Sequence, residues 1–594
     1  MTPPAYILGI DLGDGESSLA YVPVKDYAAP TVFEFKTGER SMITAVARTS
    51  DGTLIGQEAI LKKGIEELYI NSKIKPADTN LGRARMSQLR DFILEFYALF
   101  REAEPEIGRQ AQVYIGHPTS WTEEDAEVYR AWFPANVFPG IQVVRESHAA
   151  FIQVRDYARL PDALLDSVLV IDIGSSTTDI TFVKDLVPQQ LSLGDEFGAR
   201  LIDQAIFEVV EERHPHPEQL QERWETHDKD KVYLRYLCRK AKEHYFTGEP
   251  FERPKPETAS FRWVLDQCWQ YVQDLDMNAI LERPLEKFPR GWKMGFKALV
   301  MQAREEIKPE IPKIVILTGG GSRMPFTRDI CREVFPEPAT KLNPDPDPSF
   351  AVAKGLAGYG RWRYRVAAFL EAIDEFCQSK ALGEEIQKHI QPFAAAAFKF
   401  SEKHLIDEVM RPILLEAREG KTRSKDMGQD PMQYFRKRFF QWLETSEGQV
   451  AFQEEAVKFF TDPFSPYLAT ETNKICERFG MKKEDLRITI ELPGQITRRV
   501  FSMYPLIDHL LAYSLKAEIS IADLIPVWLR KAVPAKLVDV SMQAFAELEA
   551  GYIGLFFKKY NLKPDERDQF VTDIRAQIKK QLEARAAQIE RLLK

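Results

Sequence analysis

The sequence predicts an α/β protein that continues into a mostly helical carboxyl-terminal region. Over the first 360 or so residues, apolar runs typical of strands alternate with helical patterns, as they do in α/β domains. From Trp362 onward, apolar residues recur at spacings of three and four, which indicates helices. A chain of 594 residues, 44% of them hydrophobic, can bury several cores. We therefore expect one domain over residues 1–361 and a helical domain over residues 362–594.

Five apolar runs in the first domain are the clearest strand candidates, and each ends in a glycine or a polar turn. They are Tyr6–Leu12, Gln112–Gly116, Val168–Ile173, Asp179–Val183 and Lys313–Thr318. In open α/β sheets, ligands bind in the crevice beyond the strand ends. The residues that follow these strands are therefore the first candidates for a binding site.

The helical region ends in one long amphipathic stretch. A stripe of apolar residues predicts a final helix of about 30 residues, which we expect to pack on its own domain and not to form a coiled coil. The stripe consists of Phe570, Ile574, Ile578, Leu582, Ala586 and Ile589. Only Leu486–Leu492 alternates like a strand, with Ile496–Phe501 as a candidate hairpin partner. No internal repeat is visible in the sequence.

The composition argues against several classes of protein. With 80 basic and 89 acidic residues the formal charge is −9, so nucleic acid is not the expected partner. No apolar run approaches the roughly 18 to 20 residues of a membrane span, and no targeting segment is recognisable. The five cysteines are widely spaced and include no C-x-x-C pair, so we expect buried, reduced thiols. These features favour a cytoplasmic protein.

Two segments share a pattern of strand, aspartate, apolar residue, glycine and small-residue turn. They are Ile10–Gly15 and Ile171–Asp179. Small residues let backbone N–H groups converge on an anion, while a carboxylate at the strand end can reach a metal ion that bridges phosphates. Either segment alone is typical of an ordinary turn. Because the two lie about 160 residues apart in one chain, together they predict a clamp for one polyphosphate.

A third segment places Gly319, Gly320 and Gly321 between a strand and a helix. Glycines let the backbone approach a flat ring or a ribose, and the stem of Arg323 can lie against such a ring. Three glycines also occur in ordinary loops. In this chain the three glycines form the third turn along the sequence, after the two candidate phosphate turns. This order suits two turns that contact phosphates and one that contacts the base.

With these motifs the chain resembles the ATPase domain of the Hsp70, actin and hexokinase superfamily, and the Hsp70 branch in particular. The resemblance covers roughly residues 5–360. Val144–Phe151 and Pro348–Ala357 look like the two connecting helices, whose small residues suit a close crossing that forms a hinge. The resemblance implies a two-lobed actin/Hsp70-like fold, in which residues 204–300 form the upper insertion of the second lobe.

The resemblance also implies catalytic residues. Ile70–Lys73 is similar to the family segment that ends in a catalytic lysine, so Lys73 is expected to position the attacking water and balance charge on the γ-phosphate. Glu146 matches the hinge glutamate near the metal-bound waters, and Thr177 the threonine near the γ-phosphate. In simpler interpretations, Lys73 is a solvated surface lysine and Glu146 a carboxylate favoured by a helix dipole.

Metal and nucleotide contacts follow from the same resemblance. Asp11 and Asp172 match the aspartates that hold Mg²⁺ through water, with Asp172 also counted as catalytic, and Asp179 matches the third carboxylate. The residues expected to contact ATP or ADP are Gly13, Asp14, Gly15, Gly174, Ser175, Ser176, Lys242, Gly319, Gly320, Gly321 and Arg323.

Several positions depart from the family. Asp14-Gly15 stands where Hsp70 proteins have two threonines, so hydrolysis is expected to be slow. Ser175-Ser176 replaces glycines, and Arg239 and Glu243 stand where the family has a glutamate and an arginine, as if the two charges had exchanged roles. After residue 361 the alternating strands of a peptide-binding β-sandwich are not visible.

We therefore expect a Mg²⁺-dependent ATPase whose lobe closure acts on a helical output domain. That domain is expected to bind a protein client or partner in a chaperone-like or assembly role, with a co-chaperone or nucleotide-exchange factor as a further partner. Two alternatives remain open: an actin-like, nucleotide-dependent filament or scaffold protein, and, with less support, a small-molecule kinase.

Overall fold

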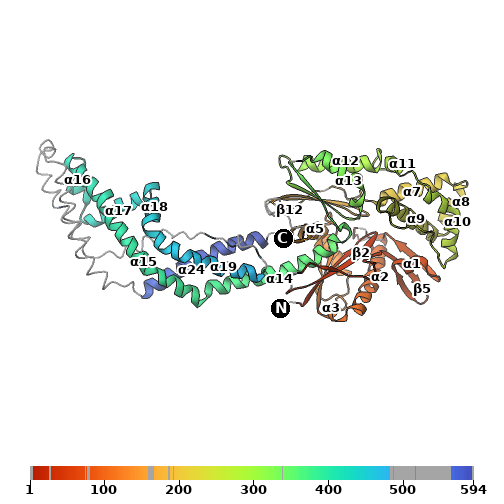
Figure 1. Ribbon diagram of the computed structural model, residues 1–594, viewed down its shortest axis with the longest axis horizontal. Coiled ribbons are helices and arrows are strands. Elements are labelled where there is room, and N and C mark those ends of the chain that lie inside the picture. Colours follow the sequence, from red (N-terminus) through yellow and green to blue (C-terminus); the bar gives the residue numbers. More distant parts are fainter. Residues whose placement is uncertain are drawn as a thin grey trace. The chain divides into compact units, whose positions relative to one another are not determined.

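A computed structural model describes residues 4–590, apart from residues 489–563, of which only residue 516 is described. Shorter stretches outside the description are residues 26–27, 72, 74, 77–79, 158–165, 185–186, 192, 338, 480, 482–485 and 487. The chain forms two compact units, residues 1–366 with 590–594, and residues 367–589 (Figure 1). The expected hairpin at residues 486–501 lies almost entirely outside the described residues.

The first lobe of unit 1 is built on one mixed sheet in the order β3-β2-β1-β8-β9, with β4 also paired to β2. Its strands are β1 (Tyr6–Leu12), β2 (Glu16–Pro23), β3 (Thr31–Val32), β4 (Ser41–Ile43), β8 (Ala111–His117) and β9 (Gln142–Arg145). Helices of this lobe are α2 (Asn80–Ala103), α3 (Pro105–Gln110) and α4 (Glu123–Ala131). A smaller sheet of β5 (Ala45–Thr49), β6 (Gly52–Ile55) and β7 (Ile65–Ile70), with α1 (Gly56–Leu61), completes it.

The second lobe repeats this strand order as β12-β11-β10-β13-β14. Its strands are β10 (Ser167–Ile173), β11 (Thr178–Lys184), β12 (Val187–Leu191), β13 (Ile314–Thr318) and β14 (Lys341–Pro344). In both lobes the central strand pairs antiparallel with the strand that follows it and parallel with a later one. The structure therefore contains a repeat that the sequence did not reveal, because the repeat lies in the pairing of strands whose side chains differ. All five predicted strands are present.

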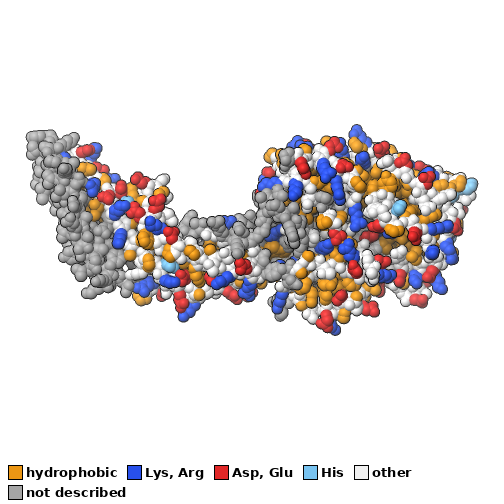
Figure 2. Space-filling model, in the orientation of Figure 1, with side chains coloured by type: hydrophobic (Ala, Val, Ile, Leu, Met, Phe, Trp, Pro, Cys, Tyr) orange, Lys and Arg blue, Asp and Glu red, His pale blue; other side chains and the backbone are white. Residues whose placement is uncertain are grey.

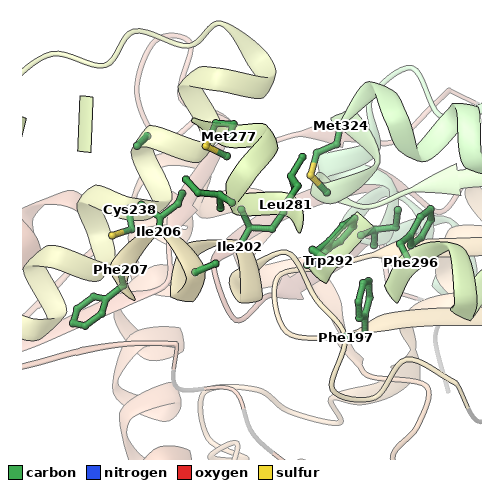
Figure 3. Close-up of a cluster of buried hydrophobic side chains, with 14 of the residues drawn as sticks. Phe197, Ile202, Ile206, Phe207, Cys238, Met277, Leu281, Trp292, Phe296 and Met324 are labelled. Carbon is green, nitrogen blue, oxygen red and sulfur yellow. The ribbon is translucent and has the colours of Figure 1, made fainter. Parts of the chain in front are cut away.

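Helices between β12 and β13 make up the rest of the second lobe. They are α7 (Arg200–Arg213), α8 (Pro217–Thr226), α9 (Asp228–Thr247), α10 (Ala259–Gln273), α11 (Met277–Glu282) and α12 (Gly291–Glu306). Figure 3 shows their buried side chains, with the rings of Phe197, Trp292 and Phe296 gathered in one cluster. The Trp292 Nε1–H also donates to the carbonyl of Gly198, 3.0 Å away. This core therefore holds the loop before α7 in place.

Two helices cross where the lobes are connected. Helix α5 (Glu146–Tyr157) follows β9, and α14 (Ala351–Gln378) follows β14 and the short turn η2 (Pro348–Phe350). A Cβ on Gly355 of α14 would lie 1.9 Å from the carbonyl oxygen of Ala149 on α5, so only glycine permits this approach. The predicted close crossing of small residues is therefore present at these helices.

Every regular element in the described residues of unit 2 is a helix or a helical turn. After the end of α14, its elements are α15 (Lys380–His404), the π-turn η3 (Leu405–Met410), α16 (Arg411–Arg418), η4 (Ser424–Met427), α17 (Pro431–Leu443), α18 (Ser446–Phe452), the π-turn η5 (Gln453–Val457), α19 (Lys458–Phe479) and α24 (Pro564–Glu590). The predicted final helix is α24, and its Phe570 packs against Phe393 of α15 and Phe460 of α19 at centroid distances of 6.0 and 5.7 Å. As expected, α24 packs on its own domain.

The structure also bears on the expectations for the cysteines, membrane spans and surface charge. The five cysteines are buried, and none of them forms a disulfide. Within the described residues, no helix is both long and apolar enough to cross a bilayer. On the visible face of unit 1, basic and acidic side chains are intermixed (Figure 2).

Candidate functional site

The first predicted phosphate turn follows β1 and is held by its neighbour in the sheet. The Thr44 hydroxyl donates to the carbonyl of Gly13 at 2.8 Å, and the Thr44 N–H donates to the carbonyl of Gly15 at 2.9 Å. The strand end and the turn are thus fixed by backbone contacts that involve no ligand.

The Asp14 carboxylate is buried and turned toward protein donors. It accepts from the Lys73 N–H at 3.2 Å, from the Asn71 side-chain amide at 3.1 Å and from the Arg200 guanidinium at 3.4 Å. Burial raises the pKa of Asp14, and Arg200 opposes that rise. The expected repulsion between this carboxylate and a bound phosphate is reduced by these contacts, which also anchor the backbone of Lys73.

The second predicted phosphate turn joins β10 to β11. Within it, the Gly174 N–H donates to the carbonyl of Thr177 at 2.9 Å. The start of α7 closes over its outer side, because the Ala199 N–H donates to Gly174 and the Arg200 N–H donates to Ser175. The turn is therefore attached directly to the start of α7, whose first N–H groups are bonded to protein carbonyls.

The third glycine segment passes close to the end of β10. Gly319 has a φ of 78°, and a Cβ there would lie 2.1 Å from a carboxylate oxygen of Asp172. Both the conformation and the contact require glycine. Residues Gly320–Arg323 then form the turn η1, which leads into α13 (Pro325–Val334).

These turns face one cleft within unit 1. It encloses about 1250 Å³ of space, a volume that includes solvent at its open mouth. Of the predicted site residues, the following line it: Asp11, Gly13, Asp14, Gly15, Lys73, Glu146, Asp172, Gly174, Ser175, Ser176, Thr177, Lys242, Gly319, Gly320, Gly321 and Arg323. Asp179 is absent from the lining. It accepts from the Thr177 hydroxyl at 3.0 Å and the Thr119 N–H at 2.9 Å, so it lies behind Thr177.

An ion pair lies in this cleft. The Lys73 ammonium and the Glu146 carboxylate are 2.6 Å apart, and the side chain of Lys73 is only 4% exposed. Burial alone would lower the pKa of Lys73, but Glu146, Tyr129 and Asp11 together outweigh burial and keep the pKa above its usual value. Lys73 is therefore charged and buried, and does not behave as a solvated surface lysine.

Several carboxylates surround this ammonium group. Burial and the neighbouring Glu146 raise the pKa of Asp11 to about 7, with Lys73 opposing, and raise the pKa of Asp179 to about 6. Burial and the nearby Asp179 raise the pKa of Asp172 well above its usual value. Like charges this close, in a site with one lysine among them, favour a further cation.

The donor chemistry suits magnesium held through water. Within the described part of the chain, no group donates a hydrogen bond to the carboxylates of Asp11 or Asp172, and no three acidic, His or Cys side chains are close enough to hold a metal directly. Hard oxygen ligands that keep waters on the ion are what Mg²⁺ prefers. The residues present therefore fit a hydrated Mg²⁺ ion.

Two predicted nucleotide contacts have protein partners in the structure. The Lys242 ammonium lies 2.8 Å from the Asp203 carboxylate and donates to the carbonyl of Ala199. The Arg323 guanidinium lies 3.4 Å from Glu249. Each of these two side chains can bind a ligand only if it also keeps its bond to the protein partner or breaks that bond.

Sequence reasoning missed several residues that line the cleft, among them Glu16, Arg239, Glu243 and Phe246. The exchange of charges between Arg239 and Glu243, relative to the family, was the sequence feature that could have pointed to these two residues. The two side chains pair with each other at 2.6 Å, and Arg239 also reaches the first phosphate turn.

We expect Asp11→Asn to raise the thermal stability of the ligand-free protein. Because the pKa of Asp11 is about 7 in the folded state and 3.8 in the reference state, the folded protein binds more protons between these values, and ionised Asp11 destabilises the fold above pH 7. The increase in stability caused by Asp11→Asn should be largest above pH 7 and should disappear as the pH falls toward 4. Calorimetry should show a rise in Tm of roughly 2 °C or more at alkaline pH.

The matched control is Glu66→Gln, which neutralises an exposed carboxylate on β7 and should leave Tm unchanged. An Asp11→Asn protein that is less stable than the wild type above pH 7 would contradict the repulsion inferred at this site.

Comparisons with known proteins relate the chain to one group. No protein-family model matches it. It is 25% identical over 387 residues to the chaperone protein DnaK of Thermosipho melanesiensis and 25% identical over 388 residues to that of Thermosipho africanus. It is 22% identical over 400 residues to a mitochondrial-type heat shock protein 70 of Encephalitozoon hellem.

These matches cover 59% to 60% of this chain, 58% of each DnaK and 63% of the heat shock protein. The chain thus spans less than two thirds of the length of the curated relatives it matches. At this level of identity the matches support a distant relationship to the Hsp70-like ATPase superfamily.

Proposed function

We propose that this protein is a Mg²⁺-dependent, Hsp70-like ATPase that couples nucleotide binding in unit 1 to a helical output domain acting on a protein client or partner. The observation that carries the proposal is the cleft, where two phosphate turns, a glycine turn and the Lys73–Glu146 pair face one space. The distant similarity to DnaK and heat shock protein 70 supports the same assignment.

Each group in the cleft has a role in phosphoryl transfer to water. The turns at Gly13–Gly15 and Gly174–Thr177 would bind the phosphates, and Gly319–Gly321 the adenosine. Bound Mg²⁺ would neutralise charge on the phosphates and would be held through water by Asp11 and Asp172, while Asp179 would add negative charge from behind Thr177. Lys73 would place the attacking water and balance the γ-phosphate, while Glu146 holds the ammonium group in position.

Lys73→Ala tests this assignment. Since a group that positions water acts mainly on the transition state, kcat for ATP hydrolysis should fall roughly 100-fold or more while ATP affinity changes little. The measurement is steady-state ATPase activity together with nucleotide titration. The matched control is Lys75→Ala, because Lys75 lies two residues later with a side chain that is 57% exposed. Normal turnover with lost affinity would make Lys73 a phosphate anchor only.

Helix α14 is the element through which unit 1 could act on unit 2. The boundary between the units, at Val366, falls inside this helix. Before that boundary, Arg361 donates to the carbonyl of Ala28 at 2.7 Å, Arg363 donates to Gln142 at 3.0 Å, and the Arg155 guanidinium of α5 lies 4.2 Å from the Trp362 ring centroid. A change at the α5–α14 crossing would therefore alter how α14 is held.

The client or partner is proposed to bind helical surfaces. Among the described residues of unit 2, which are 367–479, 481, 486, 488, 516 and 564–589, no strand is present that could pair with an extended peptide. Apolar helix faces can instead dock a helix or a neighbouring domain. A co-chaperone or exchange factor acting on this unit or on the lobes belongs to the same proposal.

Coupling predicts that protease sensitivity across residues 361–431 differs between the ATP and ADP states, because a ligand shifts a two-state element only through different affinities for its states. Limited proteolysis with mass spectrometry checks it, with Lys73→Ala used to hold the ATP state. Identical cleavage in the two states would show that the nucleotide bound in unit 1 does not affect the helical unit.

A further inference from the structure

Arg239 connects the two lobes at the first phosphate turn. Each of its three guanidinium nitrogens has its own acceptor. Nη1 donates to the carbonyl of Gly15 at 2.6 Å, Nη2 lies 2.6 Å from the Glu16 carboxylate, and Nε donates to Glu243 at 2.6 Å. Gly15 and Glu16 belong to the first lobe, whereas Arg239 and Glu243 lie on α9 of the second.

The position of Arg239 is specified by its surroundings. Its side chain is 14% exposed, and it lies between two carboxylates, one from each lobe. Lys240 also donates to Glu243, at 2.8 Å, which fixes that carboxylate on α9. A planar guanidinium with three directed bonds has little freedom to move while the cleft stays closed.

Arg200 provides a second, weaker connection between the phosphate turns. Its N–H donates to the carbonyl of Ser175 in the second turn, at 2.8 Å, and its guanidinium lies 3.4 Å from Asp14 in the first. Because this side chain is 41% exposed, solvent screens the charge pair. Arg239 is therefore the stronger of the two candidates.

The lobes also meet away from the cleft. The Lys229 ammonium of α9 donates to the carbonyl of Ile65 at 2.8 Å, and the Glu257 N–H donates to the carbonyl of Leu61 at 2.7 Å. These contacts join the same side of the second lobe to the small sheet of the first. They lie outside the cleft lining, whereas Arg239 lines it and contacts a phosphate turn.

We propose that Arg239 is a positioning residue that clamps the first phosphate turn across the cleft and thereby slows the release of bound nucleotide. The nucleotide part rests on the function proposed above. Opening the cleft must separate Arg239 from Gly15 and Glu16, so release has to break these bonds. Among the described residues, Arg239 bonds to the turn itself and not to Lys73 or Glu146, so nucleotide release is the step at which its loss is measured.

The clamp itself can be tested without nucleotide. In the ligand-free protein, Arg239→Gln should accelerate amide hydrogen exchange in peptides covering residues 12–19, because the turn loses its partner on α9. The control is Arg235→Gln, which removes the same charge one turn earlier on α9, where the side chain is exposed and has no ion pair among the described residues. It should leave exchange unchanged. Exchange that is equally slow in Arg239→Gln and the wild type would overturn the proposal.

Release is measured by stopped-flow chase of a fluorescent ADP analogue in the presence of Mg²⁺. The dissociation rate should rise about tenfold in Arg239→Gln, as expected for loss of a buried charged hydrogen bond. The rate should rise less in Arg239→Lys, which keeps the positive charge but lacks the planar guanidinium group. It should stay unchanged in Arg235→Gln.

The outcomes separate the two proposals. Faster amide exchange with unchanged nucleotide release would overturn the role in release, since the contact would then be structural only. A wild-type protein that binds no nucleotide would overturn the proposed function, while the exchange measurement would still decide whether Arg239 holds the turn.

Discussion

The structure of unit 1 depends on holding several carboxylates together at the strand ends with Lys73 as their counter-charge. Asp11 and Asp172 end the central strands of the two sheets, and Glu146 begins the helix between them. Burial and mutual repulsion raise the pKa of these aspartates, which is a cost to the folded state. A fold that retains such a cost without a ligand is typical of one that binds a cation there.

The repeated sheet order explains how the carboxylates come together. Each central strand ends at the same side of its sheet, and each is followed by a tight turn, so two similar edges face each other across the cleft. The crossing of α5 and α14 at Gly355 holds these edges close. Because α14 also contains the boundary between the units, the geometry of the cleft and the start of the helical unit share one element.

Local patterns allowed much of this arrangement to be predicted from the sequence. The strand ends and the tight turns after them follow from short motifs, the choice of Lys73 follows from the resemblance to the Hsp70 branch, and the final helix follows from its apolar stripe. The orientation of Asp14 could not be predicted, because its donors come from Asn71, Lys73 and Arg200, far along the chain. The repeat was missed because it lies in strand pairing, and the contacts of Arg239 because they join different lobes.

The central claim is that the carboxylates and the phosphate turns form one Mg²⁺–nucleotide site. Isothermal titration of the full chain with ATP, in Mg²⁺ and again with the metal chelated, tests it most directly. The account predicts saturable binding at one site per chain with Mg²⁺ and a marked loss of affinity without it, since the metal joins carboxylates and phosphates that otherwise repel. No adenine-nucleotide binding in the presence of Mg²⁺ would contradict the account.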